Sequence, residues 1–193
     1  MYAIVCILYL QSNFNFVNIN NGDIMAKLIV LSGVPGSGKS YFADAFRKSV
    51  GSGHVYVVIS DALRYEVTGN QQNLEEDKLV WKLFYGMASV YAMDKNCICI
   101  MDATNSVCKY RVGITKPFKK MYDEIHLVAF DLDKDIVRAQ NLNRLFPVKA
   151  DVLEELFTKY EAPNEQDYEF FDSVTIIKDH NIYEVIEKLK NRE

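Results

Sequence analysis

The chain has 193 residues, of which 49% are hydrophobic, and this is enough apolar material for one folded α/β domain. Its formal net charge of −4 excludes a protein that coats nucleic acid through a broad basic surface, although a few placed cations could still grip one end of a strand. The four cysteines form no CxxC pair, so we expect core thiols and a cytoplasmic protein.

Residues 1–24 differ in character from the rest of the chain. They contain no Lys or Arg, and the apolar run at residues 1–10 is too short to span a bilayer, so no signal peptide or membrane anchor is predicted. We expect a non-native or flexible extension here, with translation starting at Met25 and a single domain over residues 25–193. An extra edge strand is the alternative.

A glycine-rich loop follows the first predicted strand, at residues 27–32, and precedes a helix predicted at residues 40–50. The sequence GVPGSGKS at residues 33–40 fits the P-loop pattern in this strand-to-helix context. Its glycines let backbone N–H groups surround oxyanions, and the helix adds the positive end of its dipole. Lys39 can reach the terminal phosphates of a nucleotide, and Ser40 offers a hydroxyl to Mg²⁺. The predicted nucleotide-binding residues are Gly33, Pro35, Gly36, Ser37, Gly38, Lys39 and Ser40.

The second predicted strand, at residues 55–59, leads into SDALR and a helix from about residue 62. Ser60 or Asp61 can cap this helix, and Asp61 shares a face with Arg64, three residues later. A carboxylate beside a phosphate loop can take the proton from an attacking hydroxyl, and an arginine can bind an anionic group on the acceptor. A helix cap with a surface arginine is the alternative interpretation.

A long helix is predicted near residues 73–94, before a third strand at residues 97–101. The helix carries a core-facing stripe formed by Val80, Phe84, Met87 and Tyr91. The strand ends in MDATN, where Asp102 closes an apolar run as a Walker-B-type acid does. Asp102 could support Mg²⁺ through water or orient an arginine, and helix capping is the competing role. Thr104 and Asn105 build the turn, and we assign Thr104 to the substrate side.

Five cations without an acid among them lie in the next predicted helix, at residues 106–122, which we expect to kink at Pro117. They could face a polynucleotide strand, or they could form an ordinary solvated helix face. The five are Lys109, Arg111, Lys116, Lys119 and Lys120.

A basic loop between two helices is predicted after the fourth strand, which spans residues 125–130. Arg138, Arg144 and Lys149 surround a helix break at Pro147, an arrangement typical of a lid over phosphates. A lid arginine stabilises charge on a transferring phosphoryl group, and its removal can lower the rate by about 10³–10⁵. A solvated surface turn is the alternative. The remaining predicted elements are helices at 134–141 and 151–160, a strand at 173–177 and a helix at 182–190.

This alternation of strands and helices predicts an α/β protein with a mostly parallel five-stranded sheet covered on both faces. Ligands of such sheets bind at the carboxyl ends of the strands. The segments that follow the first four strands are all polar or glycine-rich, as a site at this edge requires. They are residues 33–40, 60–61, 102–105 and 131–133.

Residues 27–178 resemble the P-loop 5′-hydroxyl polynucleotide kinases, which are best known from phages. The matching pieces occur in order: GVPGSGKS, SDALR, MDATN, NLNR, VKADVL and YEAPNEQDYEFFDSVTII. The resemblance implies a P-loop three-layer sandwich with a helical lid, and ATP and Mg²⁺ as cofactors. Gln140 stands where an arginine often precedes the lid Asn, and Lys149 replaces the usual proline.

The resemblance also implies a role for each matching residue. Lys39 and Ser40 would hold ATP and Mg²⁺, and Asp61 would be the general base on the 5′-hydroxyl. Arg64 would contact the phosphate of the acceptor nucleotide. Arg144 would bind the donor phosphates from the lid, with Asp102 helping to position it. The predicted catalytic residues are therefore Lys39, Asp61 and Arg144.

The function expected from the sequence is ATP-dependent transfer of the γ-phosphate to the 5′-hydroxyl of an RNA or DNA end. A small-molecule kinase of the same fold, acting on a nucleoside, nucleotide or sugar, is the first alternative. A non-kinase nucleotide-dependent switch or ATPase is the second alternative, and it is less favoured because no switch sequence with a water-positioning Gln is present.

Overall fold

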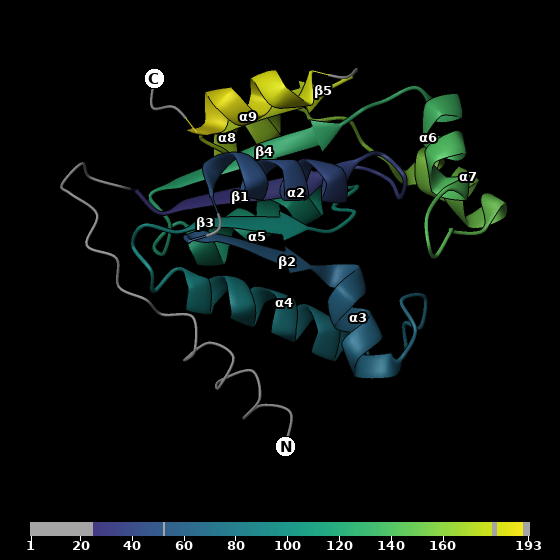
Figure 1. The fold of residues 1–193 in the computed structure, drawn as a ribbon, viewed down its shortest axis with the longest axis horizontal. Coiled ribbons are helices and arrows are strands. Elements are labelled where there is room, and N and C mark those ends of the chain that lie inside the picture. Colours follow the sequence, from purple (N-terminus) through teal and green to yellow (C-terminus); the bar gives the residue numbers. More distant parts are fainter. Residues whose placement is uncertain (1–24, 52, 179–180, 191–193) are drawn as a thin grey trace.

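Five parallel strands form the centre of the protein, in the order β2-β3-β1-β4-β5 (Figure 1). The computed structural model describes residues 25–51, 53–178 and 181–190, so the expected extension at residues 1–24 lies outside the described part. The sheet is all-parallel and the five strands lie where the sequence predicts them, to within one residue. The strands are β1 (Lys27–Ser32), β2 (Val55–Ile59), β3 (Ile98–Asp102), β4 (Glu124–Phe130) and β5 (Ser173–Ile177).

Strand β1 is the middle strand of the five, and all six of its residues are buried. Successive side chains of a strand point to opposite faces, so its apolar residues feed two separate cores. Leu28 and Val30 pack on one face, and Ile29 and Leu31 pack on the other. Such a continuous apolar run is typical of a parallel strand covered on both sides.

Helices cover both faces of the sheet and complete the predicted three-layer sandwich (Figure 1). Phe42 and Phe46 of α2 and Ile186 of α9 pack on one face, whereas Phe84 of α4 and Phe118 of α5 pack on the other. The helices are α2 (Lys39–Val50), α3 (Ser60–Thr68), α4 (Asp77–Tyr91), α5 (Cys108–Phe118), α6 (Lys134–Leu142), α7 (Ala150–Lys159), α8 (Glu165–Phe170) and α9 (Ile182–Lys190).

Helices α6 and α7 form the lid, which lies beyond the carboxyl ends of the strands (Figure 1). A small separate core of Val34, Val137 and Leu153 joins the phosphate loop to both lid helices. On the outer side Arg138 of α6 holds Glu154 of α7 through two hydrogen bonds of 2.7 and 2.9 Å. The lid is therefore one packed unit that rests on the loop it covers.

The structure corrects three predictions about helices. Helix α3 begins at Ser60 and has Ile59 at its N-cap with no side-chain cap, so neither Ser60 nor Asp61 caps it. Helix α5 ends at Phe118, in the turn that contains Pro117, instead of continuing past a kink. The predicted long helix contains only Asp77–Tyr91, and Val80 and Phe84 of its stripe are fully buried.

Helix α8 was not predicted from the sequence. It has six residues, and a capping box fixes its N-terminus. The Asn164 side chain accepts a hydrogen bond of 3.0 Å from the Gln166 N–H, and the Asp167 side chain accepts one of 3.0 Å from the Asn164 N–H. The prediction of core thiols is confirmed for Cys97, Cys99 and Cys108, which are free and buried. Burial raises the pKa of Cys99 to about 12.

Candidate nucleotide site and adjoining cavity

The loop between β1 and α2 has the geometry of a phosphate cradle. Gly36 and Gly38 adopt φ angles of 85° and 96°, which L side chains rarely adopt, and Gly38 directly precedes α2. The Lys39 ammonium donates to the carbonyl oxygens of Gly33 at 2.7 Å and Val34 at 2.9 Å. Burial lowers the pKa of Lys39, while Asp102 and Asp61 act to raise it.

Ser40 and Asp102 form a hydroxyl–carboxylate pair at the start of α2. The Ser40 Oγ donates to the Asp102 Oδ2 at 2.7 Å, and Asp102 is 4% exposed. Burial raises the pKa of Asp102, and the nearby Lys39 charge opposes that shift. No cluster of three or more metal-ligating side chains occurs in the described residues. Mg²⁺ fits such a sparse pair, because it usually takes one or two protein groups and completes its shell with phosphate oxygens and water.

A cleft of about 250 Å³ opens in front of this loop, and we call it the donor cleft. Gly33 and Ser37, both predicted to bind nucleotide, do not line the cleft; Ser37 is 1% exposed and buried inside the loop. Gln140, which departs from the polynucleotide kinase pattern, does line it. The predicted site residues on its wall are Pro35, Gly36, Gly38, Lys39, Ser40, Asp61, Asp102, Thr104 and Arg144.

Asp61 contacts two arginines from different elements. Its Oδ1 accepts a hydrogen bond of 3.2 Å from Arg64 of α3, and its Oδ2 accepts one of 3.4 Å from Arg144 of the lid. The side chain of Asp61 is 44% exposed, whereas that of Arg64 is only 9% exposed. The structure thus brings together the predicted base, the predicted acceptor arginine and the predicted lid arginine.

A second cavity of about 630 Å³ lies on the other side of Asp61, between α3, α4 and α5, and we call it the acceptor cavity. Ser60, Asp61 and Thr104 line both the cleft and this cavity, so Asp61 lies at their boundary. Arg64 also lines it, on the side expected from the sequence. The remaining lining residues are Asp77, Trp81, Tyr85, Asn105, Ser106, Lys109, Tyr110, Gly113 and Leu156.

One face of α4 supplies a wall of the acceptor cavity that sequence reasoning missed. Asp77, Trp81 and Tyr85 recur every four residues, beside the buried stripe that was predicted. Asp77 accepts hydrogen bonds from Arg64 at 2.8 Å and from the Trp81 indole at 2.9 Å. The four-residue spacing in the sequence indicates that these three side chains share one face of the helix. It does not indicate that this face lines a cavity.

The turn after β3 is fastened to the phosphate loop. The backbone N–H of Gly33 donates to Thr104 O at 2.9 Å, and the Ser32 Oγ donates to Asn105 O at 2.9 Å. The Asn105 amide returns a hydrogen bond of 2.8 Å to Leu31 O, and Asn105 has a left-handed φ of 42°. The strand end that carries Asp102 is therefore held in fixed register with the loop.

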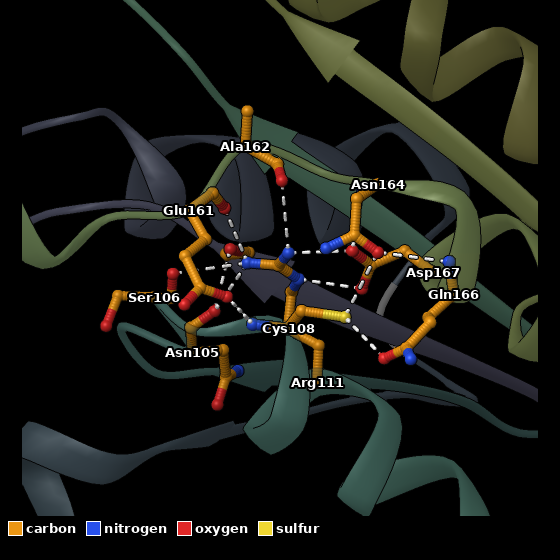
Figure 2. Close-up of polar contacts among 10 residues, drawn as sticks. Asn105, Ser106, Cys108, Arg111, Glu161, Ala162, Asn164, Gln166 and Asp167 are labelled. Carbon is orange, nitrogen blue, oxygen red and sulfur yellow. Dashed lines mark hydrogen bonds and ion pairs between the residues drawn. The ribbon is translucent and has the colours of Figure 1, made fainter.

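Arg111 is fully buried behind this turn, so it cannot belong to the exposed cationic face that the sequence suggested (Figure 2). Its guanidinium donates to both carboxylate oxygens of Asp167, at 2.8 and 2.7 Å. It also donates to the carbonyl oxygens of Asn105 at 3.4 Å, Ser106 at 3.2 Å and Glu161 at 2.8 Å. Arg111 is a structural clamp between the β3–α5 turn and the segment that leads into α8.

The three lid cations have different surroundings. Arg144 reaches Asp61 and lines the donor cleft, while Arg138 pairs with Glu154 and Asp135 on the outer surface. Lys149 is the residue before α7 and lines neither cavity. Of these three cations, only Arg144 lines the donor cleft.

Comparison with known proteins identifies the family. Residues 25–190 match the model of the KTI12 family, described as chromatin associated protein KTI12. The chain belongs to the KTI12 family. Protein kti12 of Schizosaccharomyces pombe is 28% identical over 148 residues, which cover 71% of this chain and 52% of that protein. The chain thus spans about half the length of this KTI12 relative.

Solved structures show the same fold. Kti12 of Chaetomium thermophilum, in complex with ADP-AlF3, has a TM-score of 0.65 at 17% identity and covers 84% of this chain and 97% of its own. An APS kinase of Mycobacterium tuberculosis with AMPPNP and APS has a TM-score of 0.63 at 17% identity, covering 86% and 99%. A fungal RNA kinase has a TM-score of 0.60 at 14% identity, covering 85% and 42%. At these identities the likeness shows a P-loop kinase fold alone.

The family result sharpens two expectations from the sequence. The likeness to polynucleotide kinases holds at the level of the P-loop kinase fold, and the family is KTI12. Within the described ranges, no helix has the length and apolar character that crossing a membrane requires. The cytoplasmic location stays a prediction, beside a family description that names chromatin association.

Proposed function

We propose that this KTI12-family protein is an ATP- and Mg²⁺-dependent kinase that transfers a γ-phosphate to the 5′-hydroxyl of an RNA or DNA end. One observation carries the proposal: Asp61 lies at the boundary between a P-loop cleft and a second, larger cavity. A nucleotide hydrolase needs room only for water beside the phosphate loop. A cavity of about 630 Å³ lies within the roughly 300–1,000 Å³ range of small-molecule sites, so it suits an organic acceptor.

The donor side uses the phosphate loop and the lid. Backbone N–H groups at Gly36 and Gly38 and the ammonium of Lys39 bind the phosphate oxygens. Ser40 and Asp102 would hold Mg²⁺, which would neutralise charge on the phosphates. Arg144 extends from the lid into the same cleft, where its guanidinium stabilises the charge that spreads over the transferring group.

On the acceptor side, Asp61 is the general base. The acceptor hydroxyl gives its proton to an Asp61 oxygen while its own oxygen bonds to the γ-phosphorus, and the bond from phosphorus to the ADP oxygen breaks. Arg64 and Arg144 each contact one oxygen of Asp61 and orient the carboxylate. Because Arg64 is buried and already paired with Asp61 and Asp77, it positions the base and contacts the acceptor only at the cavity wall.

The test is incubation with γ-labelled ATP and a panel of acceptors: 5′-OH RNA, 5′-OH DNA, nucleoside 3′-monophosphates, free nucleosides and a sugar. We expect label on the 5′-OH oligonucleotides. Label on a free nucleoside or a sugar, with none on any oligonucleotide, would contradict the polynucleotide assignment.

A small acceptor is the second candidate. The likeness to the APS kinase, which covers 99% of that chain, favours it. Nucleotide hydrolysis without any organic acceptor is the third candidate, and the KTI12 relative solved in complex with ADP-AlF3 is compatible with it. Label that appears only as inorganic phosphate would identify a nucleotide-dependent ATPase.

A further inference from the structure

We propose that the acceptor cavity binds the 5′-terminal nucleotide of a single-stranded nucleic acid. The base of this nucleotide lies against an aromatic wall, and its 3′-phosphate lies at Lys109. This inference rests on the proposed function, since it names what the same site accepts. The aromatic wall consists of Trp81 and Tyr85 of α4 and Tyr110 of α5.

Three rings from two helices line one cavity, which is the composition of a site for a flat, apolar face. The Trp81 and Tyr85 ring centroids are 6.4 Å apart, and the indole N–H of Trp81 is bonded to Asp77. That bond satisfies the polar edge of Trp81 and leaves its ring to apolar contact. Tyr110 is 62% exposed and comes from the opposite helix. Nucleobases stack on aromatic side chains, and such stacking is available to every base because every base has a flat π-face.

The charges around the cavity favour an anion at one position. Asp61 and Asp77 carry two negative charges, and the two arginines paired with them, Arg64 and Arg144, supply two positive charges, so the carboxylates are compensated at the cavity wall. Lys109 is exposed and, among the described residues, has no carboxylate within ion-pair distance. In the described chain the Nε of Arg64 is also buried without a hydrogen-bond partner. Because the Lys109 ammonium is not paired with a carboxylate, it can form an ion pair with a nucleotide phosphate.

The cavity is held open by the clamp shown in Figure 2. Arg111 donates to the carbonyl oxygens of Asn105 and Ser106, and both of these residues line the cavity. Asp167 fixes the guanidinium from behind with two hydrogen bonds. A wall that is already ordered costs little conformational entropy when a ligand binds.

Trp81 offers a direct readout because it is the only tryptophan in the sequence. The experiment titrates a short single-stranded oligonucleotide with a 5′-hydroxyl into the full chain, without ATP, and follows tryptophan fluorescence. We expect saturable quenching. Tyr110→Ala should weaken binding by roughly 5- to 150-fold, the range that follows from losing one base–aromatic stack. Lys109→Ala should weaken binding and reduce its salt dependence.

Matched controls lie on the same surface elements. Lys116 is exposed on the same helix as Lys109, and Tyr168 is 57% exposed on α8, but neither lines the cavity. Lys116→Ala and Tyr168→Ala should therefore leave binding unchanged. An oligonucleotide whose 5′-terminal unit is abasic should bind wild type at least as weakly as the normal one binds Tyr110→Ala, because it loses its contacts with all three rings. Tyr110→Ala should not weaken the binding of the abasic oligonucleotide any further.

Two outcomes would overturn the inference: no saturable quenching, or equal losses in the cavity and control variants. The proposed function can fail separately. Quenching with the predicted variant pattern but no transfer of label would support the cavity and refute the kinase. Label transfer that is indifferent to Tyr110 and to the terminal base would support the kinase and refute the cavity.

Discussion

Asp61 is fixed by two arginines that come from different parts of the fold. Arg64 lies one helical turn away on α3, while Arg144 comes from the lid, 83 residues later in the chain. Each carboxylate oxygen therefore accepts one arginine hydrogen bond when the lid is in the observed position, and each keeps a second lone pair for the acceptor hydroxyl. In our account lid closure and positioning of the base are one event, because the same arginine takes part in both.

Asp61→Asn tests the role of the base directly. The amide keeps the size of the side chain but cannot accept a proton, so we expect the transfer rate to fall by about 10²–10⁴. ATP binding should be nearly unchanged, since the phosphate loop is intact. Single-turnover rates and calorimetric ATP titration measure the two effects. Undiminished transfer would exclude Asp61 as the base.

Arg144→Ala tests the lid arginine, and Arg138→Ala is its matched control. Removing Arg144 should lower kcat by about 10³–10⁵ with a smaller effect on ATP affinity. Arg138 is a surface residue paired with Glu154, and exposed ion pairs contribute little to stability, so its loss should leave kcat unchanged. Equal effects of the two variants on kcat would show that the lid acts only as a packed unit.

At the scale of elements, the phosphate loop and the lid helix α6 are in close contact. A Cβ on Gly36 would meet Val137 O at 2.8 Å and Asn141 N at 3.1 Å, whereas a Cβ on Gly38 would meet nothing within 4 Å. Both glycines have a positive φ, so both alanine variants carry backbone strain. Only the variant at Gly36 also pushes on the backbone of α6.

Gly36→Ala should therefore destabilise the protein more than Gly38→Ala and loosen the lid. Urea unfolding measures the first effect, and hydrogen exchange of the amides in α6 measures the second. We expect faster exchange in α6 for Gly36→Ala than for Gly38→Ala. Identical exchange in the two variants would show that the loop and the lid are not coupled through this contact.

The clamp between Arg111 and Asp167 links α5 to α8. Both side chains are fully buried, so Arg111→Met leaves an unpaired buried carboxylate and should cost about 3–5 kcal/mol in the free energy of unfolding. The double variant Arg111→Met/Asp167→Leu should lose less than the sum of the two single variants. Denaturant unfolding of all four proteins gives the coupling energy. Strict additivity would contradict a direct ion pair.

The same pair predicts a pH dependence. Burial acts to raise the pKa of Asp167, but hydrogen bonds from Arg111 hold it below its ordinary value. A lowered pKa in the folded state contributes stability that is present above the unfolded pKa of about 3.9 and is lost as the pH falls below it. The free energy of unfolding of wild type, measured relative to that of the double variant, should therefore fall from about pH 4 downward. A relative stability of wild type that rises with acid would refute this sign.

The donor half of the site could be predicted from the sequence because its residues are contiguous. The loop at residues 33–40 stands between a predicted strand and a predicted helix, and Asp102 ends an apolar run. These local patterns suffice to identify them, and in the structure Ser40 donates a hydrogen bond to Asp102. The acceptor cavity could not be predicted in the same way. It depends on how α4 packs beside α5, and a helix face shows only that Trp81 and Tyr85 share a direction. Burial of Arg111 likewise depends on α8, which is too short to show a period.

At the scale of the whole molecule, the strand order explains why the two halves meet at Asp61. Strand β3 lies next to β1, so Asp102 ends beside the phosphate loop; β2 lies one strand further out, so Asp61 ends one position beyond it. The lid returns from β4, on the other side of β1, and reaches across to Asp61 through Arg144. The strand order β2-β3-β1-β4-β5 could not be predicted from this one amino-acid sequence. It determines that the donor cleft, Asp61 and the acceptor cavity follow one another along the edge of the sheet.

The central claim is that the γ-phosphate leaves ATP for an organic hydroxyl and not for water. The most direct measurement is a single-turnover reaction with γ-labelled ATP and a stoichiometric 5′-OH oligonucleotide, in which label is followed simultaneously in the oligonucleotide and in inorganic phosphate. Our account predicts that most of the label enters the oligonucleotide and that Asp61→Asn abolishes this fraction. Label that passes entirely to inorganic phosphate, at a rate that the oligonucleotide does not change, would contradict it.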